Sequence, residues 1–259
     1  MLKATSRAIP LQDAALSTKS QNTSTVYLSR LASPSLQSFL QGNSFRLESI
    51  DVPVVYPEIS THADILLCQL GLWEKAQIFH GDPEKLTRNY PGNIRYNAVC
   101  TGKYFIHNLQ YTDPDLLAAA EAKAAAEHTS LTKIHVKQGY TRCSLLPVDD
   151  QSFITSDIGI AKTLADYDTD VLLIRPGHIL LPGFDCGFIG GTGGGLLLAG
   201  RRLLVINGNI ENHPGHKKIA TFLEDRDIDL YYPKGSPLMD IGSILVDAAP
   251  KPLQQPVRE

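Results

Sequence analysis

The sequence predicts an α/β protein built as a closed five-bladed propeller, in which each blade reads strand–strand–helix–strand (ββαβ). Two observations lead to this fold class. The ββαβ pattern recurs about every 45 residues along the 259-residue chain. One copy is complete only when residues 240–246 are joined to residues 25–51, which places N- and C-terminal strands in one unit. Such units bury their apolar faces only against each other, and a closed ring leaves no free sheet edge.

Five helix starts mark the units. Proline suits the first helical position because its missing N–H would have no partner there, and Ser or Asp before it can cap the helix. These signals stand at Ser33-Pro34, Asp82-Pro83, Asp113-Pro114, Ser156-Asp157 and His213-Pro214. The last of the five has the proline without a Ser or Asp cap, and the fourth has the cap without the proline.

Short aliphatic strands surround these helices. Besides the split unit, the expected units are residues 62–94, 97–136, 143–174 and 195–233. In the first of these the helix is expected at residues 83–90, with a weak closing strand near Ile94. We therefore expect a flexible arm over residues 1–24, one domain over 25–247 and a tail over 248–259. A general α/β sandwich with accidental regularity is the alternative.

Composition narrows the classes of function. Apolar residues make up 43% of the chain, charged residues 20%, and the net charge is −3, so we expect no nucleic-acid or membrane partner. The N-terminal residues lack a hydrophobic signal core, which predicts a cytoplasmic protein. The four cysteines form no C-x-x-C pair, so zinc knuckles and thioredoxin-type sites are not expected. We expect free thiols at Cys68, Cys100, Cys143 and Cys186.

Three reactive residue types stand where first strands are expected to begin. His62-Ala63-Asp64 opens HADILL, Cys143 opens CSLLPV after Gly139-Tyr140, and Asp240 opens DIGSIL. Cys68 and Cys100 lie inside strand patterns and are interpreted as packing residues. Cys186 lies in a glycine-rich loop and is the rival nucleophile. The run GFIGGTGGG matches neither common nucleotide-binding pattern. We interpret it as close backbone packing near the ring centre, with a mobile loop as the alternative.

The five-unit ring and these motifs resemble the pentein, or guanidino-group-modifying, superfamily. Its members include arginine deiminase, dimethylargininase, agmatine deiminase and amidinotransferases. The family order around the ring is acid, then histidine one unit later, then cysteine two units further on. Asp240, His62 and Cys143 follow this cyclic order, so the chain resembles a circularly permuted member. The KQGY, ITSD, RPGHI and IGG segments are also similar to an uncharacterised bacterial family of this fold.

The resemblance implies a cysteine-dependent enzyme acting on a guanidino or amidino small molecule through a covalent thiouronium intermediate. It would be a deiminase, a dihydrolase or an amidinotransferase. Attack on the cationic guanidine carbon needs a thiolate, a proton for the departing amine and carboxylates that hold the planar cation. Cys143 would be the nucleophile, His62 the acid and base, and Asp240 the residue that holds His62 or the guanidinium. Asp64, Asp185, His178 and Asn97 would bind the substrate, and neither metal nor cofactor is expected.

The sequence departs from the family at three positions. The acid is Asp240 rather than Glu, and Ile241 stands where the family has the following Gly. The unit that opens near GGTGGG lacks the second substrate-binding carboxylate, for which Asp185 is a stand-in. Two alternatives therefore stay open. One is a non-catalytic binding protein of the same fold, since proteins that share a fold do not always share an activity. The other is a different cysteine hydrolase that uses Cys186 and His178. Whether the chain forms a homodimer is also left open.

Overall fold

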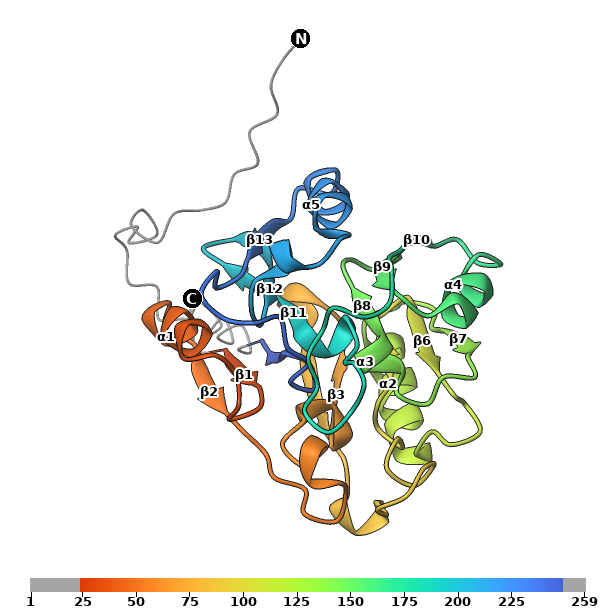
Figure 1. Cartoon of the computed structure of the whole chain (residues 1–259). Helices are drawn as coiled ribbons and strands as arrows, with labels where there is room; N and C mark the ends of the chain where they lie inside the picture. The colour runs from red at the N-terminus through yellow and green to blue at the C-terminus, as the bar shows by residue number, and fades with distance from the viewer. Residues whose placement is uncertain (1–23, 249–259) are drawn as a thin grey trace, which may run out of the picture.

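The computed structural model describes residues 24–248. The fold is mixed α/β with several small sheets, and no sheet within these residues closes into a barrel. Helices α1 (Pro34–Gly42), α4 (Ile158–Leu164) and α5 (His216–Glu224) lie at the periphery of the view, whereas α3 (Thr141–Ser144) lies near its middle (Figure 1). The predicted arm and tail lie outside the described residues, except for Ser24 and Ala248.

The first sheet joins the two ends of the described chain. Its order is β14 (Leu245–Asp247), β1 (Thr25–Tyr27) and β2 (Arg46–Glu48). β1 runs antiparallel to β14 and parallel to β2, with α1 between β1 and β2 in sequence. This pairing confirms that N- and C-terminal strands share one unit, although β14 begins later than residue 240.

Three further units keep the same pattern of an antiparallel pair followed by a helix and a parallel strand. Helix α2 (Pro114–Ala126) belongs to the first of these units, α4 to the second and α5 to the third. Their strands are β5 (Val99–Cys100), β6 (Tyr104–His107) and β7 (Thr132–His135); β8 (Leu145–Pro147), β9 (Ser152–Thr155) and β10 (Asp170–Leu173); and β11 (Gly193–Leu198), β12 (Arg201–Ile206) and β13 (Asp229–Tyr231).

The unit expected at residues 62–94 is incomplete. It has the antiparallel strands β3 (Leu67–Leu70) and β4 (Gln77–His80), but the predicted helix is only a 3-10 turn, Pro83–Lys85, and no strand forms at Ile94. The turn-forming residues 89–92, Asn-Tyr-Pro-Gly, follow too soon for a helix to extend. The prediction of five ββαβ blades is therefore wrong for this unit, and β3 pairs directly with β5 in a five-stranded sheet.

Local signals explain where the other helices begin. The side chains of Ser33, Asp113 and Asp157 cap α1, α2 and α4 by accepting a backbone N–H of the first turn. Helix α5 starts two residues after Pro214, with Gly215 at its cap. The 3-10 helices are Pro57–Ile59, Ala63–Ile65, Trp73–Lys75, Pro83–Lys85, Gly190–Thr192 and Ile210–Asn212.

The apolar core is divided into clusters that lie between neighbouring units. Leu146 and Ile206 join the β8 and β11 units, and Ile106 packs with Leu145 between the β5 and β8 units. The remaining clusters join the β3 unit to the β5 unit, and the β14 unit to both the β11 and the β3 units. Each unit thus buries its apolar residues against two neighbours, as short strands with small faces require.

Candidate active site

Cys143 lies in the helical turn α3, two residues before β8. Its Sγ donates a hydrogen bond to Asp64 Oδ2 at 2.9 Å and accepts one from Asn97 Nδ2 at 3.4 Å. The residue is 4% exposed. The thiol is therefore held between a carboxylate and an amide that come from two other units.

Asp64 lies in the 3-10 turn that precedes β3 and is completely buried. Its Oδ2 accepts a second hydrogen bond, from Ser243 Oγ at 2.5 Å. Its Oδ1 has no hydrogen-bond partner among the described residues. A buried carboxylate oxygen without a partner is costly, so this atom marks a place where a donor or cation would be stabilised.

His62 stands at the N-cap position of the same turn, without a side-chain cap hydrogen bond, and is 3% exposed. One ring nitrogen of His62, one oxygen of Asp64 and the Sγ of Cys143 all lie within 4.8 Å of one another. Within residues 24–248 no hydrogen bond to the His62 ring is found. The backbone at Gly242 has φ +72° and passes so close that an added Cβ would lie 2.1 Å from His62 Cβ, so only glycine fits there.

Asp240 precedes β14 and is 3% exposed. Its Oδ2 accepts the backbone N–H of Phe188 at 2.9 Å, and its Oδ1 accepts that of Gly242 at 3.0 Å. A Cβ at Gly191 would lie 1.9 Å from Asp240 Oδ1, so the glycine run packs directly against this carboxylate. The expected contact from Asp240 to the His62 ring is not formed within the described residues.

Asn97 joins the cysteine segment to the Asp64 segment. Its Oδ1 accepts the backbone N–H groups of Arg142 (2.8 Å) and Cys143 (3.3 Å), and its Nδ2 also donates to the Asp64 carbonyl at 3.1 Å. With these bonds and the one to the thiol, the buried amide is fully occupied. Asn97 thus shapes the cluster, and no free polar atom remains on it for a substrate.

Arg142 is a residue of the cluster that the sequence analysis did not select. Its guanidinium donates to the carbonyl oxygens of Gly190 and Gly193, both at 2.8 Å, and the residue is 5% exposed. Ser243 was also not selected, although it belongs to the quoted DIGS segment. Both residues stand beside motif residues in sequence, but nothing local showed that their side chains turn inward.

Burial dominates the electrostatics of the cluster. Burial raises the pKa of the Cys143 thiol well above its usual value, and the charges of Asp64 and Asp240 raise it further. Burial also raises the pKa of Asp64, and that of Asp240 to about 6. It lowers the pKa of His62, against the opposing effect of the Asp64 charge. The resting site therefore holds a protonated thiol and a neutral imidazole at neutral pH.

Three residues selected from the sequence lie apart from this cluster. His178 is exposed and its ring contacts the ring of His213 at 5.8 Å between centroids. Asp185 and Cys186 are exposed on the loop that leads to Phe188. None of the three is hydrogen-bonded to His62, Asp64, Cys143 or Asp240 in the described part of the chain. Cys68 and Cys100 are buried in the core, which confirms their interpretation as packing residues.

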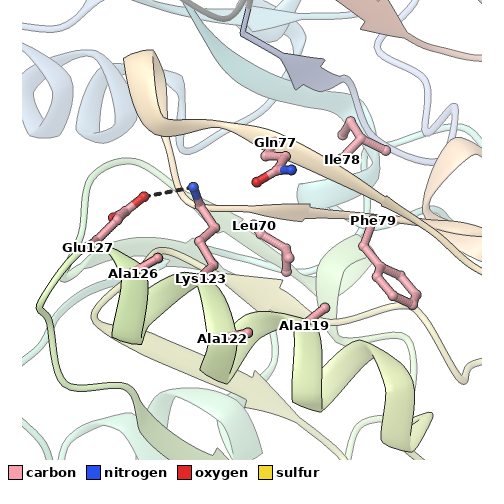
Figure 2. A pocket seen from close by; sticks show the side chains of 9 residues that line it. All are labelled: Leu70, Gln77, Ile78, Phe79, Ala119, Ala122, Lys123, Ala126 and Glu127. Atoms are coloured by element: carbon pink, nitrogen blue, oxygen red, sulfur yellow. Dashed lines mark hydrogen bonds and ion pairs between the residues drawn. The ribbon is translucent and has the colours of Figure 1, made fainter.

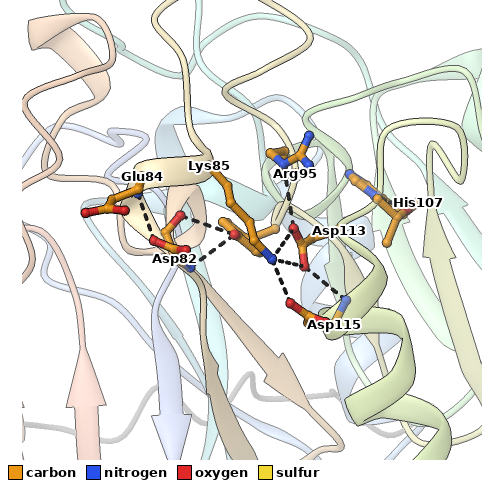
Figure 3. Close-up of polar contacts among 9 residues, drawn as sticks. Asp82, Glu84, Lys85, Arg95, His107, Asp113 and Asp115 are labelled. Carbon is orange, nitrogen blue, oxygen red and sulfur yellow. Dashed lines mark hydrogen bonds and ion pairs between the residues drawn. The ribbon is translucent and has the colours of Figure 1, made fainter.

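Polar contacts connect the segments that carry Asn97 and Cys143 to their surroundings, and those around Asp113 are drawn in Figure 3. Asp113, which caps α2, accepts a hydrogen bond from Lys85 Nζ through Oδ1 at 3.5 Å, and its Oδ2 lies 3.3 Å from Lys85 Nζ and 3.6 Å from Arg95 Nε. The Asp113 backbone N–H donates to the Arg95 carbonyl at 3.1 Å. His107 reaches the Gly139 carbonyl through Nε2 at 3.2 Å. Both segments are therefore tied to the β6–α2 region.

A groove of about 410 Å³ lies elsewhere, between strands β3 and β4 and helix α2 (Figure 2). Apart from Gln77, its uncharged residues are apolar or small, and its charged residues Lys123 and Glu127 are paired with each other at 2.7 Å. It contains no cysteine or histidine and none of the residues of the buried cluster. The groove therefore offers no reactive group, and the buried cluster remains the candidate active site.

Within residues 24–248 no helix has both the length and the apolar character needed to cross a membrane. No curated protein matches the chain. Among solved structures, the chain is similar to SxtG, an amidinotransferase from Microseira wollei in the saxitoxin biosynthetic pathway. The two share 9% identity with a TM-score of 0.42, over 81% of this chain and 88% of that chain. A similarity this low assigns neither a fold family nor a function to the chain.

A sequence model of a protein family matches residues 73–245. The matched region contains Asn97, Cys143 and Asp240, but it begins after His62 and Asp64. The match covers more than half of the chain, and the chain belongs to the family described as Family of unknown function (DUF6873).

Proposed function

We propose that the five units form a ring with the cluster at its centre, in a pentein-like arrangement with one incomplete blade. Two observations support it. Shared apolar clusters link each unit to two neighbours and return to the starting unit. The segments before all five first strands also meet at the cluster. They contribute Asp64 before β3, Asn97 before β5, Cys143 before β8, Gly190 before β11 and Ser243 before β14.

We propose that the protein is a cysteine-dependent enzyme that modifies the guanidino or amidino group of a small cationic molecule. The observation that carries this proposal is the convergence of a thiol, an imidazole and a carboxylate within 4.8 Å, with one carboxylate oxygen unpaired. A planar cation donates paired hydrogen bonds, and a free carboxylate oxygen beside the nucleophile accepts one of them. Asp64 is therefore the proposed substrate anchor.

The charges of the buried cluster favour a monocation. Asp64 and Asp240 are the buried acids, and the Arg142 guanidinium is the buried base. When Asp64 and Asp240 are both ionised, the two carboxylates exceed the single arginine by one negative charge. A guanidinium ligand would balance this charge and stabilise the thiolate of Cys143 electrostatically. Activation of the thiol would then depend on the substrate.

The proposed reaction balances with His62 as the single proton carrier. The Cys143 proton passes to His62, and the Sγ forms a bond to the guanidine carbon. The carbon–nitrogen bond to the departing amine breaks as His62 returns the proton to that amine. For hydrolysis, His62 then takes one proton from water, whose oxygen bonds to the carbon as the carbon–sulfur bond breaks. His62 passes this proton to the departing Cys143 sulfur, and the second proton of the water leaves with the released ammonia as ammonium. An incoming amine in place of water would give amidino transfer.

A non-catalytic binding protein is the second candidate, because one observation favours it. The thiol is 4% exposed and its pKa is raised, so the resting cysteine is neither ionised nor open to solvent. A ring with such a centre can bind a partner elsewhere and perform no chemistry. This candidate predicts no turnover of any guanidino compound and no covalent adduct.

The test is incubation of the purified chain with arginine, agmatine, methylarginines and guanidinoacetate, followed by assays for ureido product, ammonia and intact protein mass. We expect turnover of one of these classes, and a covalent adduct on the protein. Cys143→Ala should abolish both, since it removes the nucleophile. Cys68→Ala, which alters a buried thiol outside the cluster, should retain turnover.

A second assay uses Cys186→Ser as the background, so that the exposed cysteine does not react. Guanidino ligands should then accelerate alkylation of Cys143 by iodoacetamide at neutral pH, because a bound cation favours the thiolate. Absence of turnover across the panel, together with Cys143 alkylation that no guanidino ligand changes, would contradict the enzyme proposal and leave the binding protein.

A further inference from the structure

The buried cluster also contains a set of side chains that bind metal ions. His62, Asp64 and Cys143 each present one potential ligand atom, all within 4.8 Å of one another and all buried. Imidazole nitrogen, carboxylate oxygen and thiolate sulfur are the three donor types that Zn²⁺ takes in proteins. We infer that these three residues form a binding site for a thiophilic divalent cation such as Zn²⁺.

Two independent features point to a ligand at this place. The completely buried Asp64 Oδ1 has no hydrogen-bond partner among the described residues. The His62 ring also makes no hydrogen bond in the described part of the chain, although it is 3% exposed. Buried polar atoms are normally paired, so a cation bound to Asp64 Oδ1 would remove the cost of leaving this oxygen bare, and the imidazole without a hydrogen bond is available as a second ligand.

The geometry needs only a small contraction to hold zinc. Zinc–ligand bonds of about 2.0 to 2.3 Å place tetrahedral ligand atoms about 3.3 to 3.8 Å apart. The longest separation in the cluster is at most 4.8 Å. Cys143 Sγ and Asp64 Oδ2 are already 2.9 Å apart and would separate slightly as the ion replaces the thiol proton. That proton leaves to solvent, and a sulfur–zinc bond forms in its place.

Charge balance favours a divalent ion. A thiolate and a carboxylate supply two negative charges, which Zn²⁺ neutralises. Three protein ligands leave a fourth position for water or another small ligand. A metal-bound sulfur is no longer a free nucleophile, so zinc and a guanidino substrate would exclude each other. Zinc would therefore act as a reversible inhibitor of any cysteine chemistry at this site.

The test uses Co²⁺ as a spectroscopic substitute for zinc on the full, tag-free chain after dialysis against a chelator. We expect a thiolate-to-cobalt charge-transfer band in the near ultraviolet, together with the visible bands of a four-coordinate ion. Zn²⁺ should displace the cobalt and abolish both. Cys143→Ser should remove the charge-transfer band and weaken zinc binding at least about tenfold, in line with the loss of a ligand.

Cys186→Ser is the matched control, because it changes an exposed cysteine outside the cluster and should leave the cobalt spectrum unchanged. A second measurement does not depend on how a variant folds. Zn²⁺ should slow alkylation of Cys143 in the wild-type chain and leave that of Cys186 unchanged, as followed by peptide mass spectrometry.

A band that persists in Cys143→Ser, a band that disappears in Cys186→Ser, or equal alkylation of Cys143 with and without zinc would overturn the inference. The metal site does not depend on the proposed reaction. A chain that binds cobalt through Cys143 but converts no guanidino compound would keep this inference and lose the enzyme proposal. A chain that converts a guanidino compound but does not bind cobalt through Cys143 would lose this inference and keep the enzyme proposal.

Discussion

At the scale of single residues, Asn97 decides how the cysteine is presented. Its amide accepts two backbone N–H groups of the α3 turn and donates both to the Asp64 carbonyl and to the Cys143 thiol. The N–H···S contact favours the thiolate, against the large effect of burial. Asn97 therefore acts as a positioning residue. Its loss would lower the stability of the chain and raise the pKa of the Cys143 thiol.

Asn97→Ala should destabilise the chain by about 2 to 4 kcal/mol, because the buried N–H groups of Arg142 and Cys143 lose their acceptor. It should also raise the pKa of the Cys143 thiol, measured as the pH dependence of alkylation in the Cys186→Ser background. Asn108→Ala removes another buried amide, whose Nδ2 donates to the Lys137 carbonyl. This control should cost stability without moving the thiol pKa. An unchanged alkylation profile in Asn97→Ala would show that the contact to sulfur has no effect.

At the scale of secondary-structure elements, the caps of α2 and α4 look alike in sequence but differ in their surroundings. Asp157 accepts from Ile160 N at 2.9 Å and from Gln138 Nε2 at 3.3 Å. Asp113 caps α2 and also faces Lys85 and Arg95, with its side chain 1% exposed (Figure 3). The same cap residue therefore has one further partner in α4, a neutral amide, and two charged partners in α2.

Asp157→Ala should lower the free energy of unfolding by about 1 kcal/mol, the usual effect of losing a helix cap. Asp113→Ala should lower it by about 3 kcal/mol or more, because it also leaves the Lys85 and Arg95 charges without their buried partner. Urea denaturation of both variants at neutral pH checks the difference. Equal losses for the two variants would mean that the ion pairs around Asp113 contribute nothing.

At the scale of the whole molecule, buried titratable groups make stability depend on pH in opposite directions. Burial raises the pKa of Asp240 to about 6 and lowers that of His107 to about 4. The folded chain therefore keeps the Asp240 proton to higher pH than the unfolded chain does, so this group's contribution falls as pH rises. The contribution of neutral His107 falls instead as pH drops from about 6.5 to about 4.

Asp240→Asn isolates the first of these contributions. Between the usual aspartate pKa of 3.8 and about 6, the wild-type chain should lose about 3 kcal/mol relative to the variant as pH rises. Above pH 6 the difference should stay constant, because the carboxylate is then ionised in both states. Urea unfolding of both proteins from pH 4 to pH 8 gives the difference curve, in which His107 cancels. Parallel curves across this range would show that Asp240 is ionised in the folded chain throughout.

Sequence patterns confined to a few neighbouring residues correctly predicted where three of the helices begin. The helix caps at Ser33, Asp113 and Asp157 could be predicted because a cap side chain accepts a hydrogen bond from the turn that follows it in sequence. The pairing of β1 with β14 followed from a repeat that was complete only when the chain ends were joined. The short turn at Pro83 shows the limit of local reading, since a good start signal was followed by residues that could not continue a helix.

The sequence by itself determined the ββαβ pattern of four of the five units and brought His62, Asp64, Cys143, Asp240 and Asn97 forward as candidates. Only the tertiary structure decided which side chains meet. Cys143 and Asp64 are 79 residues apart yet share a hydrogen bond, while His178 and Asp185 stay exposed outside the cluster. The inward turn of Arg142 and the raised thiol pKa were also invisible in the sequence. Both depend on burial and on charges that approach through space, which side-chain identity and spacing along the chain do not specify.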